Sequence, residues 1–558
     1  MAIKISELPV EGNEYDGDEL VALVQDPRGS AVTSRSSLSS IAGYLSGAVT
    51  TGEVTPLASP NKINYFNCNQ CFQSGVTVVG QLSGTSNLVI GCEVTIACTA
   101  VLNSVGGGCK HSICNGSHNV IGGGVCNFQT CDRSVIGGGR FNMSRSVNTT
   151  IAGGADNNLN CSSPVAAIGG GSHNVMTCGS CSTIAGGYQN GIHGTYSAVA
   201  GGTNLSAISD YSFLGAGLSS RTLGDHSSIT SGRCNVTHGC YSFIGGGCFN
   251  QAEKDYDIVV GGLNNLACGL SSFVGGGDGN RVTNLGGAIV GGRSNCATGS
   301  RSFIGGGENN CTANGCSVVV GGSNNTATAN CAFIGGGVSN TINSSNLGTI
   351  VGGQQNSLCN SNHGFVGSGT ANSVQGHCSV LVGGFCSCVT TTYSTIVGGQ
   401  ANYVLGSANY SSVVGGRSNC IQSNASDSFI GGGCGNESTV CYATIAGGED
   451  NCLSNTHGFV GGGESNCILG SGCYSAIVGG KSNSIHCGGQ CFSFIAGGKN
   501  NQVLHSGSSV VGSDIDTVAA DTLHAKCLYL SAGALPTSDP SVAGIVWRDG
   551  TDLKISVG

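Results

Sequence analysis

One stretch of the chain contains both halves of the motif that determines the fold. Residues 287–310 read GAIVGGRSNCATGSRSFIGGGENN. Each half has a pair of apolar residues, then two or three glycines, and an asparagine a few residues later. The first half has Ile289-Val290-Gly291-Gly292 and Asn295, and the second has Phe303-Ile304-Gly305 and Asn310. The same unit recurs along most of the chain at intervals of about 15 to 16 residues, which is the signature of a repeat architecture.

A second, longer period is superimposed on the first. Phenylalanine recurs every 30 residues at Phe213, Phe243, Phe273, Phe303 and Phe333. The half that carries Phe reads Ser-Phe-Ile-Gly-Gly-Gly, whereas the other half reads Val-Val-Gly-Gly without Phe. The repeat is therefore a pair of non-identical halves, and one coil could contain either about 15 or about 30 residues. We favour the 15-residue coil, because each half has its own complete cycle of apolar pair, glycines and asparagine.

The composition of each half favours a parallel β-solenoid. Several glycines and β-branched residues per unit exclude a helix, and no apolar period of 3.6 residues is present. Glycine suits the corners because it accepts positive φ, and the amide of asparagine can bond to the copy above, forming a ladder. Stacked copies can bury an apolar face that one short unit cannot. Besides the five phenylalanines, we predict that the repeat is carried by Gly245, Gly275, Gly305, Gly335, Asn250, Asn280, Asn295, Asn310 and Asn340.

The apolar pairs also predict self-association. A 15-residue coil encloses only two or three side chains, so its core is thin relative to its surface. Because side chains alternate along a strand, one residue of each pair points inward and the other outward. Several chains packed side by side would bury the outward row. We therefore expect an oligomer, most simply a homotrimeric fibre.

The overall composition excludes several functional classes. The 558 residues include 99 glycines, only 9% are charged, and the net charge is −9. A chain without a basic field is a poor ligand for nucleic acid. No apolar stretch reaches the ~18–20 residues that span a bilayer, so no membrane insertion is expected. Residues 1–20 are acidic and lack an apolar core, so we expect synthesis in the cytoplasm without a signal peptide.

Proline and charge divide the chain into zones. Six of the seven prolines lie before residue 61 or after residue 530, and charged residues are dense in the same two regions. The predicted organisation is an N-terminal module at 1–50, a linker at 51–62, a repeat shaft at 63–512 and a C-terminal tip or trimerisation module at 513–558.

Three segments resemble known protein families. The repeat body is similar in style to the β-roll heads of trimeric autotransporter adhesins. Residues 4–45, which include Lys4-Ile5-Ser6-Glu7-Leu8-Pro9, resemble the N-terminal segment by which bacteriophage tail fibres and other virion appendages join the particle. Residues 535–557, with Leu535-Pro536-Thr537-Ser538-Asp539-Pro540 and Trp547, are similar to a segment of structural fibre proteins of tailed phages.

These resemblances imply a structural fibre of a tailed-phage virion. The protein would form a rigid external appendage that attaches to other virion proteins through its N-terminal module. It would serve host adhesion, with a host surface glycan or protein as the target. A self-associating extracellular filament or a cell-surface adhesin is the alternative.

The 32 cysteines allow three interpretations. Cys296 and Cys311 follow the repeat asparagine, in a slot where Thr326 stands in another copy, which favours a small buried apolar residue. Disulfides between adjacent coils or chains are the second interpretation. Metal sites are the third, suggested by the CxxC spacings Cys68–Cys71 and Cys178–Cys181, but neither has the second pair that a tetrahedral zinc site needs. We expect no metal and no cofactor.

Catalysis is the least favoured function. A glycan-cleaving tailspike would need paired carboxylates in a groove. Asp278 and Glu308 share a slot one 30-residue unit apart and are the only such pair that we single out. Carboxylates at corners in solvent are the simpler interpretation, and the repeats carry no long insertions that would build a cleft. We therefore expect a protein that is not an enzyme.

Overall fold

The computed structural model describes most of the repeat body. It describes residues 101–526 with gaps at 161, 471–473, 487 and 489–491, together with residues 87–91, 93–96 and parts of 535–556. Nearer the N-terminus it describes strands β1 (Val24–Gln25), β2 (Ala31–Val32) and β3 (Ile63–Phe66). Most of the expected module at 1–50, the linker at 51–62 and the Cys68–Cys71 spacing lie outside the described residues.

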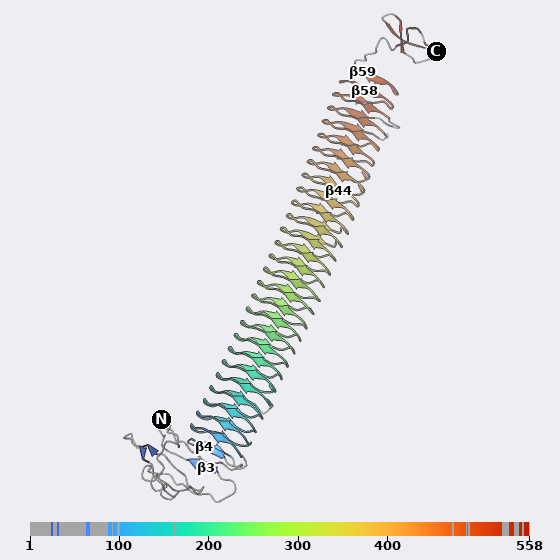
Figure 1. Ribbon diagram of the computed structural model, residues 1–558. Helices are drawn as coiled ribbons and strands as arrows, with labels where there is room; N and C mark the ends of the chain where they lie inside the picture. Colours follow the sequence, from blue (N-terminus) through green and yellow to red (C-terminus); the bar gives the residue numbers. More distant parts are fainter. Residues whose placement is uncertain are drawn as a thin grey trace. The chain divides into compact units, whose positions relative to one another are not determined.

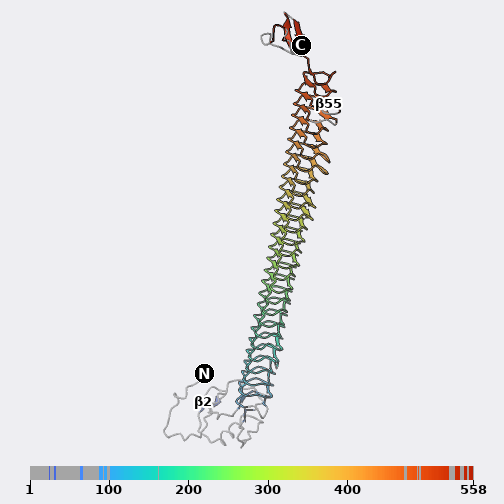
Figure 2. The ribbon, with the colours of Figure 1, turned by 90° about the vertical axis from the view of Figure 1, so that its right-hand side faces the viewer.

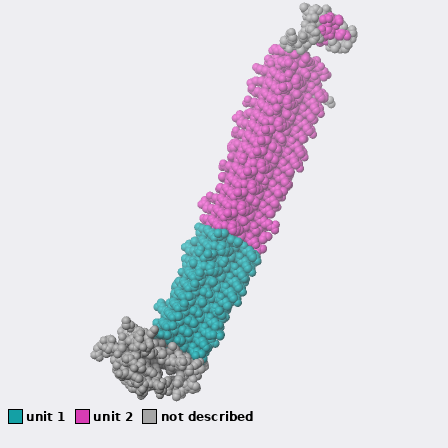
Figure 3. All heavy atoms as spheres, viewed as in Figure 1, with its two compact units in different colours: residues 1–264 teal, residues 265–558 magenta. Residues whose placement is uncertain are grey.

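Two compact units, residues 1–264 and 265–558, make up the chain (Figure 3). Each unit consists of short parallel strands stacked one coil upon the next, as Figures 1 and 2 show. The described residues contain no helix, as predicted, and hence none that could span a membrane.

The strands of each unit form two parallel sheets. In unit 1 the first sheet runs through the even-numbered strands from β4 (Asn87–Ile90) to β26 (Ile258–Val259), and the second through the odd-numbered strands from β5 (Thr95–Ile96) to β25 (Gln251–Ala252). In unit 2 the first sheet runs from β28 (Phe273–Val274) to β58 (Ser509–Val511), and the second from β27 (Leu266–Ala267) to β57 (Gln502–Val503).

Four more strands lie toward the ends of the described chain. Strand β3 joins the first sheet of unit 1 by pairing with β4, and β59 (Leu523–Ala525) pairs in parallel with β58. In the C-terminal segment, β60 (Val546–Asp549) and β61 (Asp552–Ile555) form a separate antiparallel pair that includes Trp547.

The strand register fixes the length of one coil. Val135 of β10 (Val135–Ile136) pairs with Thr150 of β12 (Thr150–Ile151), and longer coils keep the same register, as between Phe459 and Ala476. Consecutive strands of a sheet are thus one half-repeat apart. The prediction of a coil of about 15 residues is confirmed, and the 30-residue alternative is excluded.

The core of each coil is thin. In strand β32 (Phe303–Ile304) of the first sheet, Ile304 is fully buried, and in strand β31 (Cys296–Ala297) of the second sheet Ala297 is fully buried. In this coil the first sheet contributes a large buried side chain and the second sheet a small one, whereas other coils bury two large ones, such as Ile342 and Ile350. In the strands from β5 to β58 the first residue points outward and the second is buried, which confirms that the apolar pairs divide between inside and outside.

A ladder of buried asparagines closes one corner of the coils. The side-chain Nδ2 of Asn295 donates to the carbonyl oxygens of Gly291, in its own coil, and Gly307, in the next coil, both at 3.0 Å. Its Oδ1 accepts a hydrogen bond of 2.9 Å from the backbone N–H of Asn310. Burial requires that backbone polar groups be paired, and these side chains supply the partners. The same bonds recur at Asn250, Asn280, Asn310 and Asn340.

Candidate functional site

The outward side chains of the first sheet form an uncharged surface, here called the apolar face. It consists of the first residue of each first-sheet strand and the residue two positions later. The large side chains exposed on it in unit 2 include Phe303, Phe333, Phe429, Phe459, Phe494, Val290, Val320, Val351, Val382, Val397, Val414 and Val478. From β6 (Ser104–Val105) to β26 in unit 1 and from β28 to β58 in unit 2, the residues at these positions are apolar, glycine, serine or threonine, and none is charged. An exposed apolar surface of this kind marks an interaction site.

The 30-residue period flattens the apolar face. In a Phe-containing coil, the ring of Phe303 lies over Gly305, 3.5 Å from where a Cβ atom on that glycine would be. The next coil has Val318 and Val320 at the same two positions. One coil therefore covers its part of the apolar face with a single ring, and the next coil covers its part with two smaller side chains. A Cβ atom on Gly305 would also lie 2.3 Å from the backbone carbonyl oxygen of Val320 in the next coil, which favours glycine there. The same arrangement occurs at Phe243 with Gly245, Phe273 with Gly275 and Phe333 with Gly335, and Phe213, also followed by glycine two positions later, is likewise exposed.

Asp278 and Glu308, the carboxylates considered for catalysis, do not face each other. Their backbones form a bridge ladder in which Arg293 lies between them, one coil from each. Arg293 forms an ion pair with Glu308, and both side chains are exposed to solvent. This arrangement is a surface ion pair rather than an acid and a nucleophile across a cleft. A shallow hollow in unit 1 is lined by uncharged side chains and Arg221, without a carboxylate or a histidine.

The cysteines are not buried, which corrects the favoured interpretation. All 22 free cysteines among the described residues are half-buried or exposed. Cys296 and Cys311 are the first residues of their strands, so they point outward while Ala297 and Thr312 fill the core. Cys178 and Cys181 of the CxxC spacing are exposed. Cys109 forms a disulfide. The described residues contain no group of three or more His, Cys, Asp or Glu side chains that could hold a metal ion.

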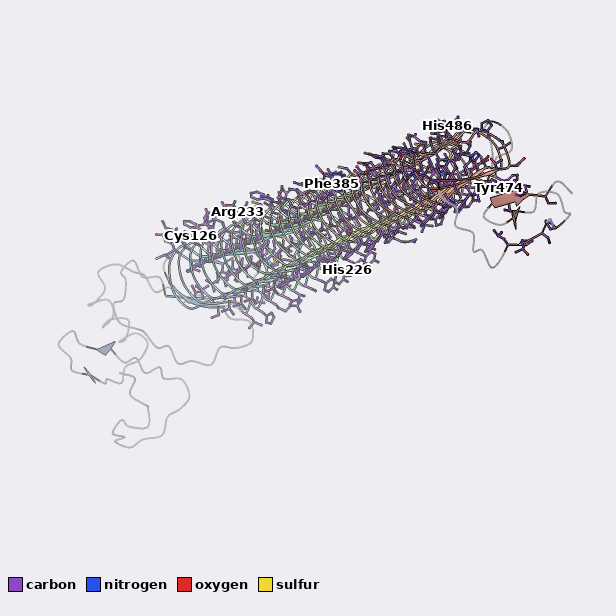
Figure 4. All side chains as sticks on the ribbon, turned by 90° about the horizontal axis from the view of Figure 1, so that it is seen from above. Cys126, His226, Arg233, Phe385, Tyr474 and His486 are labelled. Carbon is purple, nitrogen blue, oxygen red and sulfur yellow. The ribbon has the colours of Figure 1, made fainter. Side chains whose placement is uncertain are left out.

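A stack of aromatic rings lies along one edge of unit 1, and sequence reasoning did not find it. Tyr196, Tyr211, His226, Tyr241 and Tyr256 stack in successive coils with centroids 4.6 to 5.2 Å apart. All five have positive φ, which is uncommon for such residues. Figure 4 shows His226 and Arg233 projecting from opposite edges of the coils. The signal was present in the sequence, because these rings recur every 15 residues.

Comparisons with known proteins found no family model that matches the chain and no significant match among characterised proteins. The functional argument therefore starts from the surfaces described above.

Proposed function

We propose that the chain is a structural fibre protein of a tailed-phage virion, forming a rigid homotrimeric appendage used in host adhesion. The observation that carries this proposal is the uncharged apolar face, which extends through the first sheet of each unit. The similarity of residues 4–45 and 535–557 to virion fibre segments supplies the virion context.

The apolar face suits two further copies of the same chain. In unit 2 it extends from β28 to β58, roughly 70 Å at about 4.8 Å per coil. A strip of that length and about 10 Å in width has the area that one partner contributes to a stable interface, on the order of 800 Å². A second copy would bring the same alternation of coils with and without Phe from β28 to β42, so rings could oppose valines along that part of the strip.

The arrangement also supports a passive, adhesive role. The apolar face provides for assembly, and the remaining columns carry the charged and aromatic side chains that could meet a host surface. Three copies would present each such column three times and raise the avidity of a weak contact. The same fold would serve a self-associating filament, and the test below separates the two roles.

The first test is the native mass of the full chain by light scattering under reducing conditions. We expect about three times 55.2 kDa. Replacing Phe303 and Phe333 together by Asp should lower the mass to that of one chain, because buried unpaired charges oppose association. The matched control is Phe385→Asp, since Phe385 is an equally exposed phenylalanine in another column. A monomeric wild-type chain, or equal loss of association in the control, would contradict the proposed trimer.

The second test concerns location. Mass spectrometry of purified particles of the virus that encodes the chain should detect it as a structural component. Long end-to-end polymers of the purified chain, with none of it in virions, would support the filament instead.

A further inference from the structure

Two cysteines of unit 2 lie side by side in neighbouring coils. Cys296 in β31 and Cys311 in β33 (Cys311–Thr312) are direct register partners in the second sheet. Parallel neighbours are about 4.8 Å apart, within the Cα separation of about 4.4–6.8 Å that disulfides require. Both side chains point outward, both are half-buried, and the two thiol groups are hydrogen-bonded to each other. A small reagent could therefore reach both sulfur atoms at once.

A cation precedes this pair in the same column. Arg281 of β29 (Arg281–Val282) is the register partner of Cys296, so Arg281, Cys296 and Cys311 follow one another in three consecutive strands. The hydrogen bond from Cys311 lowers the pKa of Cys296 to about 6; burial opposes this change and the charge of Arg281 adds to it. The pKa of Cys311 is raised, because it holds the shared proton. The charge of Arg281, which pairs with Cys296 in register, favours the thiolate at Cys296, and the thiolate is the reactive form.

We propose that Cys296 and Cys311 form a reactive dithiol that small-molecule disulfides oxidise to a cross-link between consecutive coils. The Cys296 thiolate attacks one sulfur of the small disulfide, which forms a mixed disulfide and releases one small thiolate. Cys311 then loses its proton and attacks the Cys296 sulfur, which releases the second small thiolate. The Cys296 thiolate and the Cys311 thiol are together oxidised by two electrons, one small disulfide is reduced to two thiols, and the two released thiolates take up the proton of Cys311 and one proton from solvent.

The chain contains a natural comparison for this pair. Cys452 of β51 (Cys452–Leu453) and Cys467 of β53 (Cys467–Leu469) are register partners with the same outward orientation. The preceding strand of their column, β49 (Glu437–Ser438), provides Glu437 instead of an arginine. Hydrogen bonding from Cys467 lowers the pKa of Cys452 to about 7; burial and Glu437 oppose this change, and a hydrogen bond with Ser454 adds to it. The two dithiols therefore differ mainly in the sign of the neighbouring charge.

The cross-link would strengthen the coil stack after the protein leaves a reducing compartment. It closes a loop of one coil and so restricts the unfolded chain. The second sheet faces away from the apolar face, so association through the apolar face leaves the dithiol accessible. This inference does not depend on the proposed virion role.

The experiment uses the full-length reduced protein and two small disulfides of opposite charge, anionic glutathione disulfide and cationic cystamine. Peptide mapping without reduction follows both dithiols over time. With glutathione disulfide, the Cys296–Cys311 link should form about threefold or more faster than the Cys452–Cys467 link, because Arg281 attracts the anion and Glu437 repels it. Cystamine should reduce or reverse this ratio.

Three variants test the individual steps. Cys311→Ser should stop the reaction at a mixed disulfide on Cys296. Arg281→Gln should slow the Cys296–Cys311 link, and Glu437→Gln should accelerate the other link, with circular dichroism verifying that each variant is folded. Three outcomes would overturn the proposal. Cys296 and Cys311 could remain unlinked, the link could join two chains instead of two coils, or the ratio of the two linking rates could be the same with both small disulfides.

Discussion

The backbone N–H of Asn310 donates a 2.9 Å hydrogen bond to the side-chain Oδ1 of Asn295, one coil earlier. Asn310 in turn offers its own Oδ1 to the N–H of Asn325, at 3.0 Å. Each buried asparagine thus pairs with the coil that follows, in addition to the glycine carbonyls that its amide group reaches. The ladder makes the stability of one coil depend on its neighbours, as in other repeat proteins.

The ladder predicts a large effect of removing one asparagine. Asn295→Ala leaves the carbonyl of Gly291 and the N–H of Asn310 without their partners in a buried corner, and the carbonyl of Gly307 keeps only its bond from the N–H of Arg293. Each unsatisfied group costs about 1–3 kcal/mol, so we expect a loss of about 2–4 kcal/mol after relaxation. Amide hydrogen exchange around residue 295 measures this locally. The control is Asn309→Gly, at an exposed position with φ of 54°, which should leave exchange unchanged.

Two adjacent glycines should respond in opposite ways to alanine. Gly307 has φ of +87°, and a Cβ atom there would lie 2.0 Å from the carbonyl oxygen of Gly322. Gly306 has open space around it, and Ala216 occupies the equivalent position in unit 1. We expect Gly307→Ala to cost more than about 2 kcal/mol and Gly306→Ala to change stability by less than about 0.5 kcal/mol. Limited proteolysis of both variants would test this, and equal protease resistance would contradict it.

His111 predicts acid sensitivity in unit 1. It takes the place of a ladder asparagine: its Nδ1 accepts from the N–H of Asn127, and its Nε2 donates to the carbonyl of Gly107. Burial lowers its pKa from 6.5, against the opposing effect of hydrogen bonds to Gly107 and Gly124. Below about pH 6.5 the unfolded chain therefore binds a proton that the folded chain does not, and stability falls as the pH falls.

Hydrogen exchange of residues 101–130 at pH 7.5 and pH 5 measures this effect. After correction for the slower intrinsic exchange of amides at pH 5, the protection factors should be lower at pH 5 than at pH 7.5. His111→Asn should remove this loss of protection, because asparagine supplies the same bonds without titrating. An acid response that persists in this variant would assign the sensitivity to another group.

The aromatic stack of unit 1 predicts a preference at position 226. His226 stacks on Tyr211 and Tyr241 at 4.6 Å on each side. His226→Tyr should retain both contacts, whereas His226→Ala loses both at about 0.5–1.5 kcal/mol each. Near-ultraviolet circular dichroism and hydrogen exchange of the neighbouring coils should separate the two variants, and identical spectra would show that the stack does not form in solution.

Which residue of a short strand faces inward was harder to predict than the strand itself. The prediction that Phe303 and Ile304 point to opposite sides of their strand is confirmed. The prediction that Cys296 is buried is wrong, because Cys296 points outward and Ala297 fills the core. In a two-residue strand, a shift of one position exchanges the two faces. The direction is set by the asparagine corner, which fixes where the strand begins, and not by the apolar character of the residue.

The sequence by itself determined the repeat, the absence of helix and the asparagine ladder, whereas the strand register decided between a coil of about 15 residues and one of about 30. The first three features depend on local periodicity and on the conformational preferences of glycine and asparagine, which a single chain displays directly. Only the tertiary structure decided that Cys296 meets Cys311, that Tyr211 stacks on His226 and that Phe303 covers Gly305. Such contacts join side chains whose distance depends on strand register and on the position of each corner, and these are fixed only when the coils stack.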